Sequence, residues 1–436
     1  MSNQTIYWAH FNAEQEWQDA SFAKLPAVLF SKNTLPIALL DEVYRPDGNS
    51  GIALTLVPQD PVLTEFHQSL GLNFHRESVF ESIEQWLSAG QPNWPDLFSR
   101  SDTVITEGVK YSLKLLSCSP QKPYSVIPGA LQEKFSSNKT ANLSTIININ
   151  SKSFITELCQ QAGIPCEGIV VRNAQQLNAA LNQQKFPFII KEPFGVSGKG
   201  SIIIKDSSSL QQVERYLLKQ IDKGQKLDIL VQPWFEKELD FSSQWIIDEQ
   251  GKQHLLGLSL IKNKGLKFIG VTALPAEIES LVKDSQYFFY IKKLLNCIHQ
   301  QGYVGPLGID SMLLVDGSIY PIVEVNARET MGSIAQRWFN ALGKAQSLTL
   351  AQWDITYHQP INFKLLLAEL KQQNCLFDKR DYSGILPLAT TSMQLPFNNG
   401  QQKKGRWYQI HSSRYDRSDL ARQLDIALNK QGASLL

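Results

Sequence analysis

Two apolar segments around Asp316-Gly317 constrain this chain more than any other part of its sequence. An Asp-Gly pair between two apolar segments is a strong signal for a β-hairpin. We therefore expect a hairpin over residues 306–328. Asp310 then lies near the outer end of one strand and Glu324 near the outer end of the other.

The length of the hairpin turn decides whether these two acids meet. A two-residue loop pairs Asp310 with Val323 and puts Glu324 on the opposite face. A three-residue loop ending at Ser318 pairs Asp310 with Glu324 directly. A bulge has the same effect, and strands tolerate a proline such as Pro321 mainly at edges or bulges. We predict either the three-residue loop or a bulge.

Facing carboxylates inside apolar strands predict a bound cation. Burying such a charge is costly unless something neutralises it. The ligands available here are all oxygens, which favours Mg²⁺. Asn326 and Arg328 follow Glu324 almost at once and add a further oxygen and a cation. A solvent-facing hairpin with ordinary surface acids is equally compatible with this motif taken alone.

The composition indicates a folded chain of several domains. A length of 436 residues corresponds to about two to four domains. Hydrophobic residues make up 43% and charged residues 19%, and the net charge of +1 does not favour nucleic acid as a partner. No apolar run reaches the roughly 18 residues of a membrane-spanning helix, and residues 1–8 do not resemble a signal peptide. We expect no membrane partner and a cytoplasmic location.

The five cysteines are odd in number, and no pair has Cys-x-x-Cys spacing. A zinc site or a disulfide framework is therefore not expected, and a reduced, cytoplasmic protein is. Cys159 lies at an apolar position of a predicted helix, where a place in the core is commoner than a catalytic role.

Residues 1–145 mix short apolar runs with turn clusters. The strands expected in this part cover residues 27–30, 36–40, 52–57 and 103–106. Ser78 and Glu81 form a capping box before a helical pattern. We expect an N-terminal α/β domain with a parallel or mixed sheet. The polar segment 134–144 is expected to be a linker.

Residues 150–345 form the second predicted domain. Its expected helices cover residues 151–163, 173–184, 210–221 and 276–301, and its expected strands 186–191, 201–205, 229–232, 241–248 and 254–261. The pattern weakens over residues 346–436, which we expect to be a partly helical C-terminal extension. Its expected helices cover residues 361–373 and 418–430, with a loop over 398–405.

The glycine-rich segment 195–201 is a candidate phosphate-binding loop. Glycines let backbone N–H groups converge on an anion, and Lys199 adds positive charge. The segment is not a Walker A loop, because Ser201 follows Gly200 and predicted strands stand on both sides. It would therefore close a hairpin, and a plain turn is the alternative. Lys191 ends the preceding apolar strand, where it is either a phosphate ligand or a lysine whose ammonium extends into water.

Taken in order, these segments resemble the ATP-grasp superfamily over roughly residues 150–345. The resemblance is carried by the Lys152 helix with Gly-Ile-Pro165, the Phe-Ile-Ile-Lys191 strand, the 195–201 loop, Val231-Gln-Pro-Trp-Phe235 and the hairpin from Asp310 to Arg328. It implies an ATP-grasp fold, in which two α+β subdomains sandwich ATP. That fold would be preceded by the N-terminal α/β domain and followed by the C-terminal extension.

The resemblance also implies which residues contact the triphosphate. Lys152 and Lys191 match the two lysines that touch the α- and β-phosphates in this superfamily. Gly198, Lys199 and Gly200 match the flexible flap that covers the phosphates. All five are therefore expected to bind ATP.

The adenine and the ribose have expected partners as well. Gln232 begins a hinge that would bind adenine through its backbone, and Trp234 or Phe235 would pack near the base. Many members have Glu where this chain has Gln232, and an amide oxygen can still accept from the adenine amino group. Either Glu238 or Asp240 would bind the ribose, with Asp240 preferred because it leads directly into the next strand.

By the same resemblance, Asp310, Glu324 and Asn326 are the Mg²⁺ ligands. Arg328 lies where some members hold the substrate carboxylate, and the bidentate geometry of arginine suits that role. Lys262 is a candidate for contact with the γ-phosphate, with a solvated lysine as the simpler interpretation.

The activity that the resemblance implies is that of an ATP-dependent ligase. Such an enzyme activates a carboxylate as an acyl phosphate and joins it to an amine, releasing ADP and phosphate. Amino-acid or peptide carboxylates and amines are the preferred substrates, and a homo-oligomer is possible. The alternatives are a phosphotransferase on the same scaffold and a non-catalytic nucleotide-binding protein.

Overall fold

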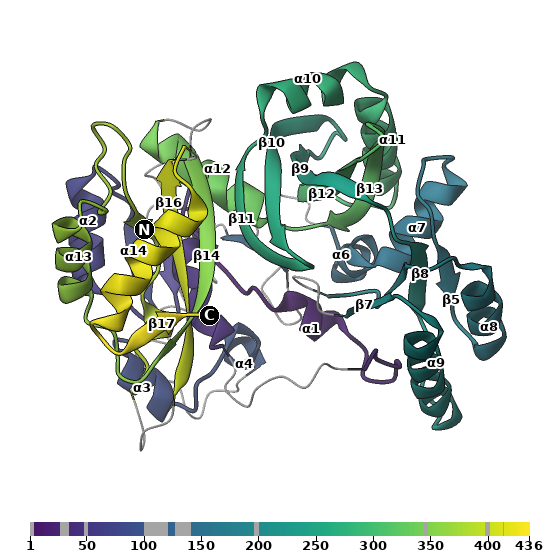
Figure 1. The fold of residues 1–436 in the computed structure, drawn as a ribbon, viewed down its shortest axis with the longest axis horizontal. Helices are drawn as coiled ribbons and strands as arrows, with labels where there is room; N and C mark the ends of the chain where they lie inside the picture. The colour runs from purple at the N-terminus through teal and green to yellow at the C-terminus, as the bar shows by residue number, and fades with distance from the viewer. Residues whose placement is uncertain are drawn as a thin grey trace.

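The computed structural model carries its fold on three β-sheets (Figure 1). The yellow C-terminal segment and most of the N-terminal region lie on one side of the molecule in Figure 1, and the middle of the chain forms the other, which the purple segment after α1 reaches. The residues that the structure describes are 4–26, 35–47, 51–99, 121–126, 141–195, 200–343, 348–396, 402–412 and 414–436.

The N-terminal sheet is parallel, as expected of an α/β domain. Its order is β3-β2-β1-β4, and all three pairings are parallel. Its strands are β1 (Ile6–Trp8), β2 (Ile52–Thr55), β3 (His75–Ser78) and β4 (Gln121–Pro123). The helical segments of this part are α1 (Ala13–Trp17), η1 (Ile37–Val43), α2 (Pro61–Ser69), α3 (Ile83–Ser88) and α4 (Trp94–Ser99).

Two local predictions in this part were wrong. Residues 37–43 form a 3₁₀ helix rather than a strand, because a short apolar run fits either a buried helix or a buried strand. The helix expected from Ser78 begins instead at Ile83, where the Ser82 side chain accepts the N–H of Gln85. The strands expected over residues 27–30 and 103–106 lie outside the described residues.

A four-stranded antiparallel sheet follows, in the order β5-β8-β6-β7. Its strands are β5 (Ile169–Val171), β6 (Phe188–Lys191), β7 (Ser201–Ile204) and β8 (Ile229–Pro233). The helices of this region are α6 (Leu143–Asn150), α7 (Lys152–Gln161), α8 (Ala174–Gln183) and α9 (Ser207–Asp222). Since β6 and β7 are paired neighbours, the glycine-rich segment connects the two strands of a hairpin, as predicted.

The largest sheet has the order β13-β12-β9-β10-β11-β14-β16-β15, with β17 paired to β14. Its strands are β9 (Lys237–Ile247), β10 (Gln253–Lys264), β11 (Lys267–Ala273), β12 (Gly305–Leu314), β13 (Ile319–Asn326), β14 (Leu348–Tyr357), β15 (Leu386–Pro387), β16 (Lys403–Ser412) and β17 (Ala433–Leu435). The helical segments that accompany it are α10 (Ala276–Asp284), α11 (Tyr287–Gln300), α12 (Met331–Leu342), α13 (Phe363–Gln372), η4 (Thr391–Met393) and α14 (Arg417–Asn429).

Several elements in these two regions differ from the predictions. The predicted linker ends in α6, whose N-terminus is capped by Asn142. The long helix expected over residues 276–301 is two helices, separated near Ser285, whose hydroxyl accepts the N–H of Tyr287. Strands β11, β14 and β16 were not predicted, and β16 begins inside the expected loop 398–405. Because β14 pairs with β11, strand pairing crosses the predicted boundary at residue 345.

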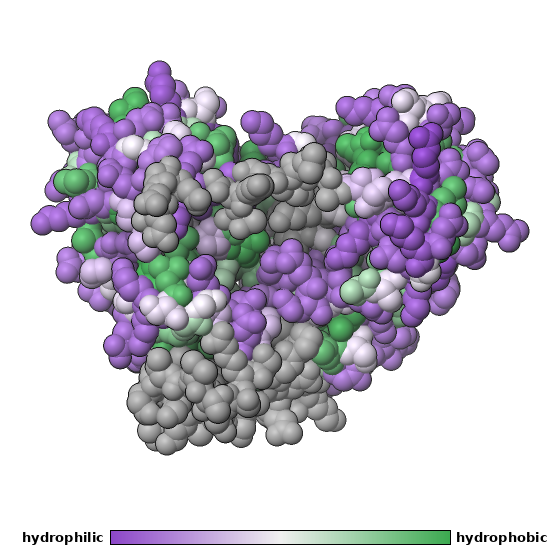
Figure 2. Space-filling view, turned by 90° about the horizontal axis from the view of Figure 1, so that it is seen from below, coloured by the Kyte–Doolittle hydropathy of each residue, from purple (hydrophilic) through white to green (hydrophobic). Residues whose placement is uncertain are grey.

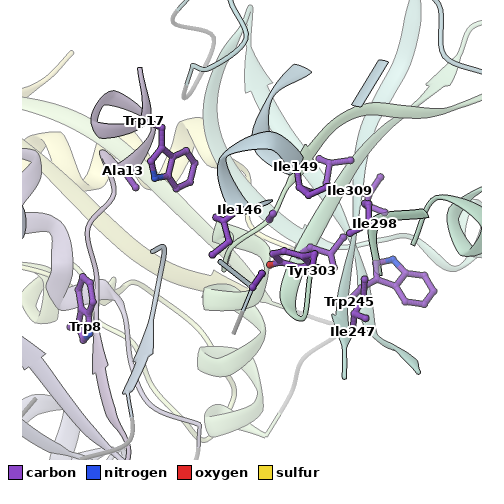
Figure 3. Close-up of a cluster of buried hydrophobic side chains, with 14 of the residues drawn as sticks. Trp8, Ala13, Trp17, Ile146, Ile149, Trp245, Ile247, Ile298, Tyr303 and Ile309 are labelled. Atoms are coloured by element: carbon purple, nitrogen blue, oxygen red, sulfur yellow. The ribbon is translucent and has the colours of Figure 1, made fainter. Parts of the chain in front are cut away.

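A buried hydrophobic cluster packs against the hairpin from the side opposite its acids (Figure 3). Ile309 belongs to this cluster, together with Trp245 on the neighbouring strand and Ile149 on α6. Side chains alternate between the two faces of a strand, so burying Ile309 turns Asp310 the other way. Each such side chain contributes about 1.5–3 kcal/mol when fully buried. The register of β12 is therefore held by its apolar face.

The face of the molecule shown in Figure 2 is mainly hydrophilic, with small, separate hydrophobic areas outside the grey atoms. Within the described ranges, every helix is too short or too polar to cross a bilayer.

Candidate active site

The β12–β13 hairpin brings the two predicted acids together. Asp310 pairs directly with Glu324 in the register. The turn is a three-residue loop over residues 315–317, one residue earlier than the predicted 316–318, and the N–H of Leu314 donates to the carbonyl of Ser318 at 2.9 Å. Because the side chains of directly opposed residues lie on one face, the acids point to the same side of the sheet.

The hairpin also contains the bulge that was offered as an alternative. The register shifts between Asp310 and Met312. The Ser311 hydroxyl donates to the carbonyl of Pro321 at 2.7 Å, inside the irregular stretch. The predicted bulge is thus confirmed, and it is the bulge that pairs Asp310 with Glu324.

Asp310 and Glu324 have different electrostatic environments. Burial, and then repulsion by Glu324, raises the pKa of Asp310 to about 7. The Asn326 amide donates to Oδ2 of Asp310 at 3.3 Å. Burial also works against the charge of Glu324, but Lys152, 2.8 Å from its Oε1, together with Lys191 and Arg328 outweighs burial and lowers the pKa of Glu324. A pair that is only partly neutralised by the protein fits a site that binds a cation.

The two predicted lysines lie beside the acids. Lys152 is the first residue of α7, and Ser151 caps that helix. Burial opposes the charge of Lys152, but Glu324 and Glu14 outweigh it, so its pKa is raised. Lys191 ends β6 and makes no ion pair with the residues that the structure describes. Burial lowers the pKa of Lys191 to about 8. An anion would therefore find an incompletely neutralised ammonium here.

A cavity of about 290 Å³ collects most of the predicted site residues. The predicted residues that line it are Lys152, Lys191, Gln232, Trp234, Phe235, Asp240, Asp310, Glu324, Asn326 and Arg328. The cavity reaches three of the four strands of the small antiparallel sheet and the strands from β13 to β11 of the large sheet, so it lies between the two sheets.

Near Gln232, the cavity has a side-chain oxygen available as a hydrogen-bond acceptor and a wall of aromatic rings. The Gln232 amide donates through Nε2 to the carbonyl of Glu167 at 2.6 Å, which leaves Oε1 to accept a hydrogen bond. Phe235 packs on Tyr320, with ring centroids 4.8 Å apart, and both line the cavity. Trp234 lies between Gln232 and Phe235 and also lines it.

The structure separates the two candidate ribose acids. Asp240 lines the cavity, and its Oδ2 accepts from Lys237 at 2.5 Å and from Asn263 at 2.8 Å. Glu238 is exposed and does not line the cavity. Asp240 is therefore the acid within reach of a ligand.

Lys262, the candidate for contact with the γ-phosphate, does not line this cavity. Its neighbours Ile261 and Asn263 line the cavity, whereas Lys262 does not. Alternation along β10 turns its side chain to the other face. Burial lowers the pKa of Lys262, and the charge of Arg417, the first residue of α14, lowers it further.

The glycine-rich segment is described only at its ends. Gly195 and Ser201 line the cavity, and Gly200 has a φ of +73°, which glycine adopts readily. The predicted flap residues Gly198 and Lys199 lie outside the described residues.

Arg328 has two partners that were not expected from the sequence. Its Nη2 lies 2.5 Å from Oε1 of Glu14, although the two residues are 314 positions apart. Its Nη1 donates to the Tyr124 hydroxyl at 3.4 Å. No local pattern marks Glu14 or Tyr124, because their role depends on a contact between distant parts of the chain.

A metal site here would use two carboxylates and one amide. No cluster of three or more His, Cys, Asp or Glu residues with metal-binding geometry occurs in the described part of the chain. The set Asp310, Glu324 and Asn326 offers only oxygens, which is the donor set that Mg²⁺ prefers, with water completing its coordination. The residues present therefore fit Mg²⁺.

The chain resembles known proteins in one sequence segment and in its fold. No protein-family model matches the chain. A segment of 145 residues, 33% of the chain, is 35% identical to the butirosin acyl-carrier protein–L-glutamate ligase of Niallia circulans. The match spans 33% of the length of that relative.

In structure, the chain is similar to the ADP complex of N5-carboxyaminoimidazole ribonucleotide synthetase, with a TM-score of 0.53 and 12% identity over 99% of this chain and 98% of that one. It also aligns with an L-amino acid ligase from Bacillus licheniformis, with a TM-score of 0.46 and 16% identity over 88% of this chain and 98% of that one. The chain therefore has the ATP-grasp fold that the resemblance implied.

Proposed function

We propose that the chain is an ATP-dependent ligase that activates a carboxylate as an acyl phosphate and joins it to an amine. The observation that carries the proposal is the pairing of Asp310 with Glu324 on the face of a hairpin that lines the cavity. Lys152, Lys191 and Arg328 line the same cavity. A cavity lined by two acids and three cationic side chains suits a nucleotide, a divalent ion and an anionic substrate together.

The nucleotide would lie between the two sheets. Gln232 would accept from the adenine amino group, with Trp234 and Phe235 beside the base. Asp240 would accept hydrogen bonds from the ribose hydroxyls. Lys152 and Lys191 would contact the phosphates. A bound anion would stabilise the charge of Lys191 more, because burial has lowered the pKa of Lys191.

Mg²⁺ would be held by Asp310, Glu324 and Asn326. When bound, the ion neutralises charge on the phosphate oxygens and favours displacement at phosphorus. Asp310 would be ionised with a cation beside it, since the ion outweighs the repulsion from Glu324.

The acid end of the cavity would be at Arg328. Its guanidinium would hold the substrate carboxylate in line with the γ-phosphorus. One carboxylate oxygen forms a bond to phosphorus as the bond to ADP breaks, which gives the acyl phosphate. The amine then forms a bond to the carbonyl carbon, loses a proton, and phosphate leaves. No covalent protein nucleophile is needed.

The substrate class is proposed from chemistry and from the relative. The name of the Niallia circulans ligase specifies L-glutamate and an acyl-carrier protein. We therefore place amino acids first among the acids. A phosphotransferase is the second candidate, but its hydroxyl acceptor would give Arg328 no carboxylate to bind.

The test is an ADP-release assay with ATP, Mg²⁺ and pooled L-amino acids or dipeptides. We expect release to depend on an added acid, and hydroxylamine to trap a hydroxamate from the acyl phosphate. Glu324→Ala should abolish release, whereas Glu238→Ala, an exposed acid two positions before Asp240, should not. ATP binding with no acid-dependent release would reject the ligase. Release that needs a hydroxyl compound and yields no hydroxamate would favour the phosphotransferase.

A further inference from the structure

Glu14 is a buried carboxylate that the proposed reaction does not use. It lies in α1, the purple helix between the two sides of the molecule in Figure 1, shortly after β1. Its side chain is 5% exposed, and its Oε1 lies 2.5 Å from Nη2 of Arg328. Its Oε2 accepts the N–H of Gly195 at 2.8 Å. One carboxylate therefore joins two cavity-lining residues that are far apart in sequence.

The contacts around Arg328 fix the direction of its guanidinium. Nη1 donates to Tyr124, and the guanidinium carbon lies 5.7 Å from the centroid of that ring. Burial opposes the charge of Arg328, but Tyr124 and Glu14 outweigh it and raise its pKa. Arginine has five N–H donors. Glu14 and Tyr124 can therefore hold the guanidinium in place while its remaining N–H groups donate to a bound anion.

We propose that Glu14 is a positioning residue that holds Arg328 and the start of the glycine-rich segment in one arrangement. The N-terminal region would thereby set the affinity of the site for the acid substrate. This inference rests on the proposed function for the identity of the anion. It does not require Glu14 to touch the substrate, because the carboxylate acts through Arg328.

Glu192 provides a matched control. It is also a partly buried acid that ties the N-terminal region to the glycine-rich segment, since its Oε1 accepts the N–H of Leu25 at 2.6 Å. It makes no contact with Arg328. Glu192→Gln and Glu14→Gln therefore remove the same charge from the same part of the molecule, and only the second change releases Arg328.

The first measurement uses pooled L-amino acids with hydroxylamine as the acceptor, and ADP as a separate binding probe. Glu14→Gln should raise the half-saturating concentration of the pool about tenfold, in line with the loss of a charged hydrogen bond, with the dissociation constant of ADP within twofold. Glu14→Asp, which keeps the charge, should restore part of the loss. Glu192→Gln should leave both values within twofold. The proposal would be overturned if Glu14→Gln left the half-saturating concentration of the pool unchanged. It would also be overturned if the affinity for ADP fell by the same factor as the affinity for the pool.

The second measurement needs no substrate. Phenylglyoxal modifies guanidinium groups, and peptide mass spectrometry reports the rate at each arginine. Glu14→Gln should speed modification of Arg328 severalfold, while Arg337, which pairs with Asp47 and Glu329, should keep its rate. Equal rates at Arg328 in the parent and the variant would refute the positioning role. Faster modification without turnover of any acid would keep this role and reject the ligase. Glu14→Asp serves if Glu14→Gln does not fold.

Discussion

At the scale of single residues, the acids of the hairpin were predictable and the partner of Arg328 was not. Asp310 and Glu324 belong to one local hairpin, and the bulge that Pro321 suggested is what pairs them. Glu14 meets Arg328 only because two distant parts of the chain fold against each other. The position of Lys262 outside the cavity lining was not predictable for a similar reason. The pairing of the neighbouring strands decides which face of β10 lines the cavity.

The choice between Asp240 and Glu238 gives a prediction at this scale. Asp240→Ala should raise the KM for ATP about tenfold, because a hydrogen bond to a charged group contributes roughly 1.5–3 kcal/mol. Glu238→Ala should change this KM less than twofold, since the side chain is exposed and away from the cavity. Steady-state kinetics of ADP release measures both. A larger effect for Glu238 would reverse the assignment.

Lys191 gives a prediction about pH. Its pKa of about 8 lies below the ordinary value of 10.5, so it loses its charge as pH rises from about 7 to 9. Binding of ADP, followed by calorimetry, should weaken over this range. In Lys191→Arg the charge persists, and the pH dependence should become shallower. An unchanged dependence in that variant would assign the titration to another group.

The same lowered pKa affects stability in the opposite direction. Between about 8 and 10.5 the unfolded chain binds more protons at Lys191 than the folded one. The contribution of this residue to the free energy of unfolding therefore rises through that window.

At the scale of elements, the sequence indicated the antiparallel hairpins and helices of residues 150–345 better than the strands after residue 345. Helices α7 and α8 and the β6–β7 hairpin have clear caps, periodicity and turn glycines. Strands β14 and β16 carry polar residues such as Gln352 and Gln409 at buried positions. The expected alternation of apolar and polar residues is therefore blurred there.

The junction of β12 with α12 gives a prediction at this scale. A Cβ on Gly308 would lie 2.6 Å from Cγ2 of Thr330, the residue that caps α12. Gly308→Ala should lower the free energy of unfolding by about 1–3 kcal/mol, as expected of overpacking. Gly257→Ala is the control, because its nearest contact would be 3.6 Å. Urea unfolding compares the two, and equal stability would show that Thr330 moves freely.

At the scale of the whole molecule, the region after residue 345 is part of the structure that carries the site. Strand β14 pairs with β11 in the sheet that also contains Asp310 and Glu324. Leu348 and Leu386 share a buried cluster with Trp338 of α12. These contacts join segments that are distant in sequence, which is why the composition of the C-terminal region did not reveal them.

Removal of the C-terminal region tests this continuity. A chain ending at Gly343 would expose the edge of β11 and the buried face of α12, so we expect it to be insoluble or to lose ADP binding. Solubility and calorimetry with ADP provide the readout. A soluble fragment that binds ADP as the full chain does would show that the region is an independent addition.

The proposed acyl phosphate is tested most directly by following oxygen. The L-amino acid pool is labelled with ¹⁸O in its carboxylates and incubated with the full chain, ATP, Mg²⁺ and mixed amines. Mass spectrometry or ³¹P NMR of the released phosphate then locates the label. We predict one ¹⁸O atom per phosphate, because a carboxylate oxygen bonds to phosphorus before the amine displaces phosphate. ADP formation with unlabelled phosphate would contradict the proposed reaction.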